Sequence, residues 1–271
     1  MPFVPRASFA WRLYRRLVRT HVEFFSVPEG LPDVDVLKLC SLPAPFPGVP
    51  NESCPTILID LAAPEEDLWN GVDPKTRKVI RQADRENIVV ERLPELTKEA
   101  WDDFFAAYGK LWRRKNRAGA LGVGQIGELA ARGQLVMTAS RDGAGHVLSW
   151  HGYAFAHGRA RLLNTASDMD PARGTQWNNL IGRAHRLHHW RDILQFKANG
   201  ARIYDLGGVY RGVEDQEQAN IARFKRNFGG QFVETYDAVV PLTLKGRLAL
   251  SLVARINPET RAGGPALKVP A

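Results

Sequence analysis

The sequence predicts an α/β fold, more narrowly α+β, in which a mixed and largely antiparallel sheet is flanked by helices. Two observations lead to this prediction. Three strand segments follow one another with only short turns between them, which is the pattern of an antiparallel meander; they are residues 135–140, 147–156 and 159–166. A long helical segment, 175–196, then leads into a short buried strand, 201–206. This alternation of helix and strand favours a layered fold of both element types.

The N-terminal segment differs in character from the rest of the chain. Residues 7–25 carry apolar side chains at helical spacing and arginines on the other side, which predicts a basic amphipathic helix. It either packs against the domain or binds an anionic membrane surface or RNA. Residues 31–55 hold six prolines, so we expect an extended connection there, with one strand at 34–39. We therefore expect residues 1–55 to form a separate unit.

The next segments alternate between the two element types. Residues 56–61 read as a strand, and a helix follows in which proline and acidic residues occupy the first turn, as helix N-termini favour. A second helix spans 74–87, a short strand 88–92, and a third helix begins at Thr97 with a broad apolar face. A strand at 234–241 completes the expected main domain, 56–241. Residues 242–271 follow as a basic amphipathic helix and a tail rich in Gly and Pro.

Two clusters of positive charge interrupt this pattern. Arg77 and Arg81 lie on the helix 74–87, and Arg114 belongs to a dense basic run at 110–117 with no acidic residue nearby. An anionic ligand would offset the repulsion within each cluster. A solvated helix surface in the first case, and a solvated loop containing Gly119, Gly122 and Gly124 in the second, explain the sequence almost equally well.

Composition limits the class of partner and the cellular compartment. The chain has 271 residues, a formal charge of +8 and a pI near 9.7, which favours an anionic partner such as RNA, a phosphorylated cofactor or a membrane surface. Its two cysteines predict reduced thiols rather than a disulfide framework. No apolar run reaches the roughly 18 residues of a spanning helix, and no secretory signal is evident. We therefore expect a cytoplasmic protein, with the inner face of the membrane as a further location.

The segment 203–230 carries the strongest functional signal. A short buried strand ends at Gly207 and Gly208, where the backbone can turn or approach a ligand closely. The charged segment 211–218 reads as a solvated loop. The helix 221–228 that follows places Phe224 on one face and Lys225 on another, and two glycines then end it. A lysine is thereby held beside an aromatic anchor.

These residues resemble a known signature. IYDLGGV followed by FKRNFGG is similar to the paired blocks of the Fem-type (FemABX) transferases, a branch of the GNAT acyltransferase superfamily. The segments TILIDL, LW and KTRKVIRQADRENIVVE resemble the strand, helix and basic helix that open the family's second GNAT-like unit. The resemblance covers roughly residues 56–240 and implies a GNAT-like sheet and N-acyl transfer. The chain departs from the peptidoglycan-bridge members in length, because they carry two complete GNAT-like units and usually a coiled-coil arm.

The resemblance assigns a role to Lys225, and the chemistry of the residues around it suggests further roles. Lys225 matches the family's lysine that stabilises the oxyanion of the reacting carbonyl or binds the end of the donor, with Phe224 as its aromatic support. Arg223, Gly207 and Gly208 belong to the same expected donor or substrate site. Asp205 would accept a proton or hold the incoming amine, and Tyr204 would donate a hydrogen bond to the reacting groups. The alternatives are a surface lysine and an aspartate that caps a backbone turn.

Two further sequence patterns are weaker indications of function. Arg173 and Gly174 precede the long helix, where GNAT enzymes place backbone amides against a cofactor pyrophosphate. The segment ARGTQW has only one glycine, whereas acyl-CoA enzymes usually show Q/R-x-x-G-x-G/A. Three histidines, His185, His188 and His189, are spaced like metal ligands on one helical turn, but no fourth ligand is evident. We expect them to form a basic surface face and expect no metal.

The sequence therefore predicts an acyltransferase without a tightly bound cofactor. The preferred donor is aminoacyl-tRNA, and the preferred acceptor is an amine of a cell-envelope precursor or of a peptide-like metabolite. Two alternatives remain open: an acyl-CoA-dependent enzyme, using acetyl-CoA or another acyl-CoA, that acts on an amino sugar in polysaccharide synthesis, and a GNAT-like module that only binds an anionic partner. The N-terminal helix is the expected site of peripheral membrane contact.

Overall fold

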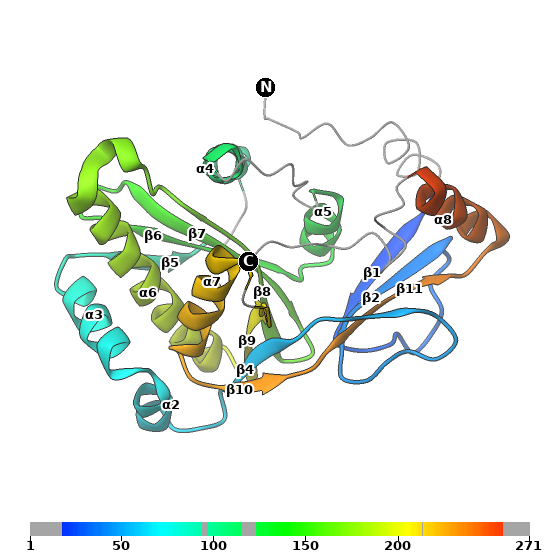
Figure 1. Ribbon diagram of the computed structural model, residues 1–271, viewed down its shortest axis with the longest axis horizontal. Coiled ribbons are helices and arrows are strands. Elements are labelled where there is room, and N and C mark those ends of the chain that lie inside the picture. Colours follow the sequence, from blue (N-terminus) through cyan, green and yellow to red (C-terminus); the bar gives the residue numbers. More distant parts are fainter. Residues whose placement is uncertain (1–17, 94–96, 115–122, 213, 257–271) are drawn as a thin grey trace.

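The computed structural model describes residues 18–93, 97–114, 123–212 and 214–256. Its centre is a seven-stranded sheet with the order β10-β4-β9-β8-β7-β6-β5 (Figure 1). The strands are β4 (Thr56–Asp60), β5 (Val89–Arg92), β6 (Leu135–Arg141), β7 (Val147–Ala156), β8 (Arg159–Ser167), β9 (Ile203–Gly208) and β10 (Gln231–Val233). Every neighbouring pair is antiparallel except β8 and β9, which run parallel. The expected mixed, largely antiparallel sheet and its meander are confirmed.

Helices cover both faces of this sheet (Figure 1). One face packs against α2 (Glu65–Gly71), α3 (Pro74–Asp84), α6 (Gly174–Ala198) and α7 (Gln216–Arg226). The other face packs against α4 (Lys98–Arg114) and α5 (Val123–Ala131). Because successive strand residues point to opposite faces, Val136 joins the core beneath α6 while Met137 joins the core beneath α4. Two hydrophobic layers therefore hold the sheet between them.

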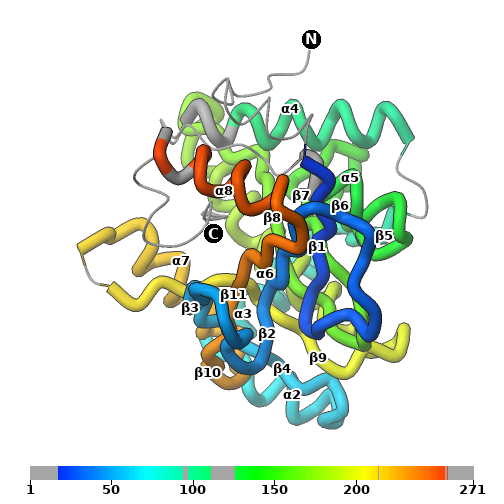
Figure 2. The backbone as a smooth tube through the Cα atoms, turned by 90° about the vertical axis from the view of Figure 1, so that its right-hand side faces the viewer, coloured from blue at the N-terminus to red at the C-terminus, as the bar shows by residue number. Residues whose placement is uncertain are grey.

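A second sheet lies beside the first, at the right of Figure 1. It has the order β1-β2-β11-β3 and contains β1 (Thr20–Phe24), β2 (Val36–Leu42), β3 (Asn51–Ser53) and β11 (Tyr236–Pro241). Strand β11, the last among the described residues, thus pairs with two strands that precede residue 56. Helix α8 (Leu244–Ile256) follows β11 and packs against one end of this sheet (Figure 2). The N- and C-terminal parts of the chain therefore build one sheet together.

Several boundaries differ from expectation. The predicted helix 7–25 is wrong for Thr20–Phe24, which form β1 and pair in parallel with β2; residues 7–17 lie outside the described residues. A neighbouring strand supplies backbone partners that helical spacing does not reveal. The expected loop 211–218 is wrong at its end, because Asp215 caps α7 by accepting a hydrogen bond from the backbone nitrogen of Gln218 at 3.0 Å. The expected glycine loop after residue 117 is helical from Val123, where α5 begins.

Candidate active site

The end of β9 depends on glycine. Gly207 has a φ of +74°, and a Cβ at this position would lie 2.6 Å from the carbonyl oxygen of Leu162 on β8. No side chain fits at that distance, and the left-handed backbone is itself unfavourable for other residues. The strand can therefore turn here while remaining in close contact with its neighbour. The turn presents the carbonyl group of Gly208 to α7.

Lys225 lies against this turn. Its Nζ donates a hydrogen bond to the carbonyl oxygen of Gly208 at 2.6 Å, and only 6% of the residue is exposed. Burial lowers its pKa to about 7; the positive charge of Arg161 acts in the same direction, and Asp205 opposes the shift. His189, on α6, also interacts electrostatically with the amine. Because one hydrogen bond leaves two ammonium protons uncommitted, Lys225 is chemically able to donate to a carbonyl oxygen.

Asp205 is fully buried, and both of its carboxylate oxygens accept hydrogen bonds. Its Oδ2 pairs with Arg159 at 2.5 Å and with Arg161 at 2.9 Å, while its Oδ1 accepts from the hydroxyl group of Thr56 and from the backbone nitrogen of Gly207. The two arginines and the hydroxyl outweigh burial and lower its pKa to about 2. A carboxylate this acidic is a poor base, so the expected proton-accepting role is not supported. The geometry instead makes Asp205 the residue that fixes the turn at Gly207.

Tyr204 does not reach the turn. Its side chain points into the core beneath α6, where its hydroxyl lies 2.8 Å from Nδ1 of His189 and 2.8 Å from the hydroxyl of Tyr153. Burial raises its pKa well above the usual value. Both hydrogen-bonding capacities of the hydroxyl are therefore used inside the protein. The expected contact with reacting groups is not supported, because the alternation along β9 sends Tyr204 and Asp205 to opposite faces.

Phe224 sets the orientation of α7. Its ring stacks on His185 with centroids 5.2 Å apart and planes 13° apart, and Arg186 lies over the same ring at 5.2 Å. This packing holds one face of α7 against α6, so that the next residue, Lys225, faces β9. Arg223 is exposed on the opposite side of the helix. Phe224 and Lys225 are therefore brought together with the glycine turn, whereas Arg223 is directed to solvent.

The N-terminus of α6 lies at the same edge of the sheet. Because β8 and β9 are parallel, the loop that leaves β8 and the turn that ends β9 emerge on one side. Arg173 is the N-terminal flanking residue of α6 and makes no side-chain cap, and Gly174 has a φ of +80°. The guanidinium of Arg173 lies over Trp177 at 3.3 Å and pairs with Asp168 at 2.7 Å. The first backbone amides of α6 thus lack a side-chain partner from the flanking residue.

The predicted basic clusters lie elsewhere. Arg77 donates to Asn70 at 3.0 Å. Arg81 lies 5.3 Å from the ring centroid of Trp69, in an open groove of about 480 Å³ that is also lined by acidic side chains from α2 and α3. This groove is mixed in charge and does not include Lys225. Arg114 ends α4 on the opposite face of the sheet, and its side chain is outside the described residues. The structure does not join these arginines to the candidate site.

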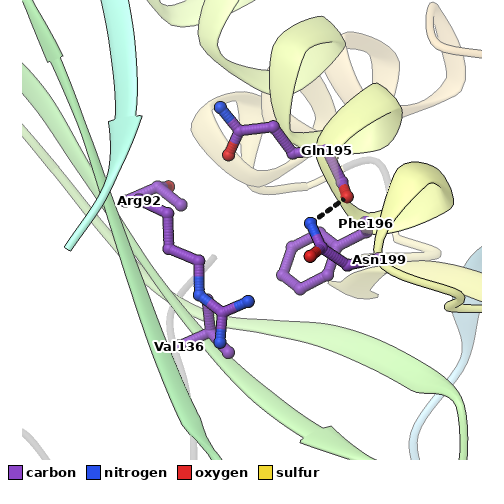
Figure 3. A pocket seen from close by; sticks show the side chains of 6 residues that line it. Arg92, Val136, Gln195, Phe196 and Asn199 are labelled. Carbon is purple, nitrogen blue, oxygen red and sulfur yellow. Dashed lines mark hydrogen bonds between the residues drawn. The ribbon is translucent and has the colours of Figure 1, made fainter. Parts of the chain in front are cut away.

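Figure 3 shows a second, much smaller cavity beside the C-terminal half of α6. Its volume is about 10 Å³, enough for no more than a water molecule. The side chain of Asn199 donates to the carbonyl oxygen of Gln195 at 2.6 Å next to it. The cavity is too small for a substrate and lies away from the glycine turn.

The expectation of a basic histidine surface is wrong. His188 and His189 are 0% and 1% exposed, and His185 is half-buried. Burial lowers the pKa of all three well below the usual value, so the rings are neutral. His185 and His189 are covered by Phe224 of α7, whereas His188 packs against β6 and β7. Neither contact is visible in the sequence of α6 alone.

Arg159 and Arg161 were not among the predicted site residues. A signal for them existed, since two arginines separated by one residue in a strand must share a face. Their meaning depended on Asp205, which lies 46 residues further along the chain from Arg159. The pair became interpretable only when β8 and β9 were placed side by side.

The sequence matches no protein-family model and no curated protein. Among solved structures, FemX superposes with a TM-score of 0.55 at 13% identity, over 74% of this chain and 63% of FemX. The fold is FemX-like. L-PGS from Bacillus licheniformis superposes with a TM-score of 0.51 at 11% identity, over 82% of this chain and 73% of that one. The fold expected from the Fem-type resemblance is confirmed, although the FemX-like chain spans less than two thirds of FemX itself.

Proposed function

We propose that this chain is an N-acyltransferase that moves an aminoacyl group from aminoacyl-tRNA to an amine of a cell-envelope precursor or of a peptide-like metabolite. The observation that carries the proposal is Lys225, a buried amine with a depressed pKa beside the glycine turn of a FemX-like fold. A lysine without a functional role would be expected to lie in solvent at the surface of a helix. A desolvated lysine at a strand end is the arrangement expected of a functional group.

The chemistry needs few groups from the protein. The unprotonated acceptor amine attacks the ester carbonyl of the donor, and negative charge develops on the carbonyl oxygen. The ammonium group of Lys225 donates a hydrogen bond to that oxygen and stabilises the charge in a water-poor site. Collapse of the adduct breaks the ester C–O bond and releases the ribose hydroxyl, which takes up a proton, while the new amide nitrogen loses one. Asp205 keeps the turn in place throughout and transfers no proton.

The charge of the chain supports a polyanionic donor. A net charge of +8 favours tRNA, and the single glycine of the ARGTQW segment argues against a typical pyrophosphate loop. An acyl-CoA-dependent enzyme acting on an amino sugar is the second candidate. It is favoured by one observation: the uncapped N-terminus of α6 lies at the same edge as Lys225, where its amides suit a phosphate.

A reconstituted reaction separates these candidates. Candidate amines are incubated with charged tRNAs or with acyl-CoAs, and the products are read by mass spectrometry. We expect a mass increase of one aminoacyl residue that disappears when the charged tRNA is first treated with ribonuclease. Activity that survives ribonuclease and requires acyl-CoA would assign the second candidate. Failure of every donor, together with retained binding of an anionic ligand, would assign the non-catalytic module.

A membrane-borne acceptor fits a surface on α8. Leu244, Leu248 and Leu252 are 71%, 63% and 52% exposed and lie one helical turn apart, with exposed Arg247 and Arg255 on the same side. Such a face suits an anionic bilayer surface. No helix among the described residues has the length and apolar character to cross a bilayer. We place peripheral contact here and at residues 7–17, the part of the predicted basic helix 7–25 that lies outside the described residues, at the cytoplasmic face.

Liposome sedimentation tests this contact. Serine at all three exposed leucine positions should reduce pelleting with vesicles that contain anionic phosphatidylglycerol and leave the free protein folded. Deletion of residues 1–17 tests the second segment in the same assay. Pelleting that is unchanged in both variants would remove membrane contact from the proposal.

A further inference from the structure

Three histidines converge beneath Phe224, two of them buried and one half-buried. His151 comes from β7, and His185 and His189 come from α6, four residues apart and therefore on one helical face. Each offers a ligand atom within 4.8 Å of the other two. The ring centroids are 5.0 Å apart for His151 and His185, 4.4 Å for His151 and His189, and 4.9 Å for His185 and His189. This triangle takes no part in the proposed acyl transfer.

The hydrogen bonds determine which ring nitrogens are free. Tyr153 donates its hydroxyl to Asp192 at 2.6 Å, so it must accept from Tyr204, and Tyr204 must accept from Nδ1 of His189. Nδ1 of His151 donates to the same carboxylate at 2.7 Å. Both histidines therefore carry their proton on Nδ1 and a lone pair on Nε2. The carboxylate behind His151 is the outer partner that metal-binding histidines characteristically have.

Two of these nitrogens lack any partner. Nε2 of His151 and Nε2 of His185 are buried and have no hydrogen-bond partner within the described part of the chain. Unpaired buried nitrogens are rare because their desolvation is not repaid. Neutral imidazoles are the form that binds metal.

His188 is different, although it lies in the same cluster. Its Nδ1 is 2.7 Å from the hydroxyl of Ser149 and its Nε2 is 2.8 Å from the hydroxyl of Thr138. Both ring nitrogens are therefore occupied. The hydroxyl of Thr138 also donates to Asp192 at 3.1 Å. His188 belongs to a hydrogen-bonded network rather than to a ligand set, which makes it a matched internal control.

We propose that His151, His185 and His189 bind one divalent transition-metal ion, with Zn²⁺ as the best fit. Three imidazoles and a fourth open position are an established zinc arrangement. Zinc bonds of about 2.0–2.1 Å place the ligand nitrogens about 3.3 Å apart and the ring centroids about 5 Å apart, close to the spacing of these rings.

The bound ion would stabilise the fold close to Lys225. It would join β7 to α6 at one point and fix the orientation of His185, on which Phe224 stacks. Because Lys225 follows Phe224, the ion would hold the α7 helix without touching the substrate. Of the three residues, only His185 is half-buried rather than buried. The inference is independent of the proposed acyl transfer.

The test is metal binding by the full chain, purified with a tag that contains no histidine. Inductively coupled plasma mass spectrometry should measure about one zinc ion per chain. After removal of the metal with a chelator, titration with ZnCl₂ should show one site and raise the melting temperature. Cobalt substitution should give the intense visible absorption of a four-coordinate ion with nitrogen ligands. His185→Gln should lose stoichiometric binding, His188→Gln should keep it, and Tyr204→Phe should weaken it about 10- to 100-fold as an outer-partner change.

Titration of the wild-type chain with metal tests the proposed site even if the variants do not fold. A folded apo chain that binds neither zinc nor cobalt overturns the proposal. A cobalt spectrum with a sulfur charge-transfer band would move the site to Cys40 or Cys54 and overturn it as well. Equal zinc content in folded His185→Gln and His188→Gln, checked by near-ultraviolet circular dichroism, would have the same effect.

Discussion

Replacing Lys225 with methionine separates its chemistry from its packing. Methionine keeps most of the side-chain volume and removes the charge, so the helix contact with β9 is largely retained. Turnover should be lost, because no donor then faces the carbonyl oxygen. Stability at neutral pH should be equal to or greater than that of wild type, since the variant no longer buries an amine.

The pH dependence of this stability difference can be calculated. The pKa of Lys225 falls from 10.5 to about 7 on folding. Between these values the unfolded chain binds a proton that the folded chain does not, so wild-type stability rises with pH across this window. Within this window each unit of pH changes the free energy of unfolding by about 1.4 kcal/mol. The change between pH 7 and pH 8 is smaller, because the folded lysine is still half-protonated at pH 7. From pH 7 to pH 9 the wild type should therefore gain about 2 kcal/mol relative to Lys225→Met.

Urea unfolding followed by tryptophan fluorescence at pH 7, 8 and 9 measures this difference. Comparison of the two proteins cancels the titration of the groups that they share. A difference that stays constant with pH would refute the reasoning, because Lys225 would then keep an ordinary pKa and would not be desolvated.

Lys197→Met is the matched control. Nζ of Lys197 also donates to backbone carbonyl groups, those of Leu61 and Ala63 at 2.6 and 2.7 Å, but near the opposite end of β9. Its replacement should reduce stability and leave turnover per folded molecule unchanged. Equal loss of turnover in both variants would show that the effect is structural.

Three further predictions follow from the site. The rate constant kcat should fall as pH rises through about 7, because Lys225 loses the proton that the proposed mechanism uses to stabilise the oxyanion; a kcat that does not fall in this range would contradict the proposed role. Asp205→Asn should lower the free energy of unfolding, measured by urea unfolding, by about 3–5 kcal/mol, because it breaks a buried ion pair. Since the pKa of Asp205 is about 2, the wild-type contribution is present above about pH 4 and is lost only as pH falls toward 2; a loss already complete at pH 5 would contradict this. Gly207→Ala should lower stability by about 1–3 kcal/mol and lower turnover, through strain at its positive φ and contact with Leu162, and a variant with wild-type stability would contradict the assigned turn.

Much of the central sheet could be predicted because its signals are local. The turns at Asp142 and Gly158 lie between strands that are adjacent in sequence, and those strands pair with each other. The placement of Lys225 beside the glycine turn was also accessible, since both lie within one 28-residue segment, 203–230. The helix that carries Lys225 follows the strand closely enough to pack against it.

The order of most elements, the glycines that end β9 and the lysine that faces them could therefore be predicted from local sequence patterns. Contacts between distant segments were needed to establish that Thr20–Phe24 form a strand and that Asp205 is held by two arginines. The three-dimensional fold was the source of both findings. It also decided that the histidines of α6 converge with His151 in the core. Local periodicity reports which face of an element is apolar. The identity of the groups opposite that face, which sets charge state and hydrogen bonding, depends on segments distant in the chain.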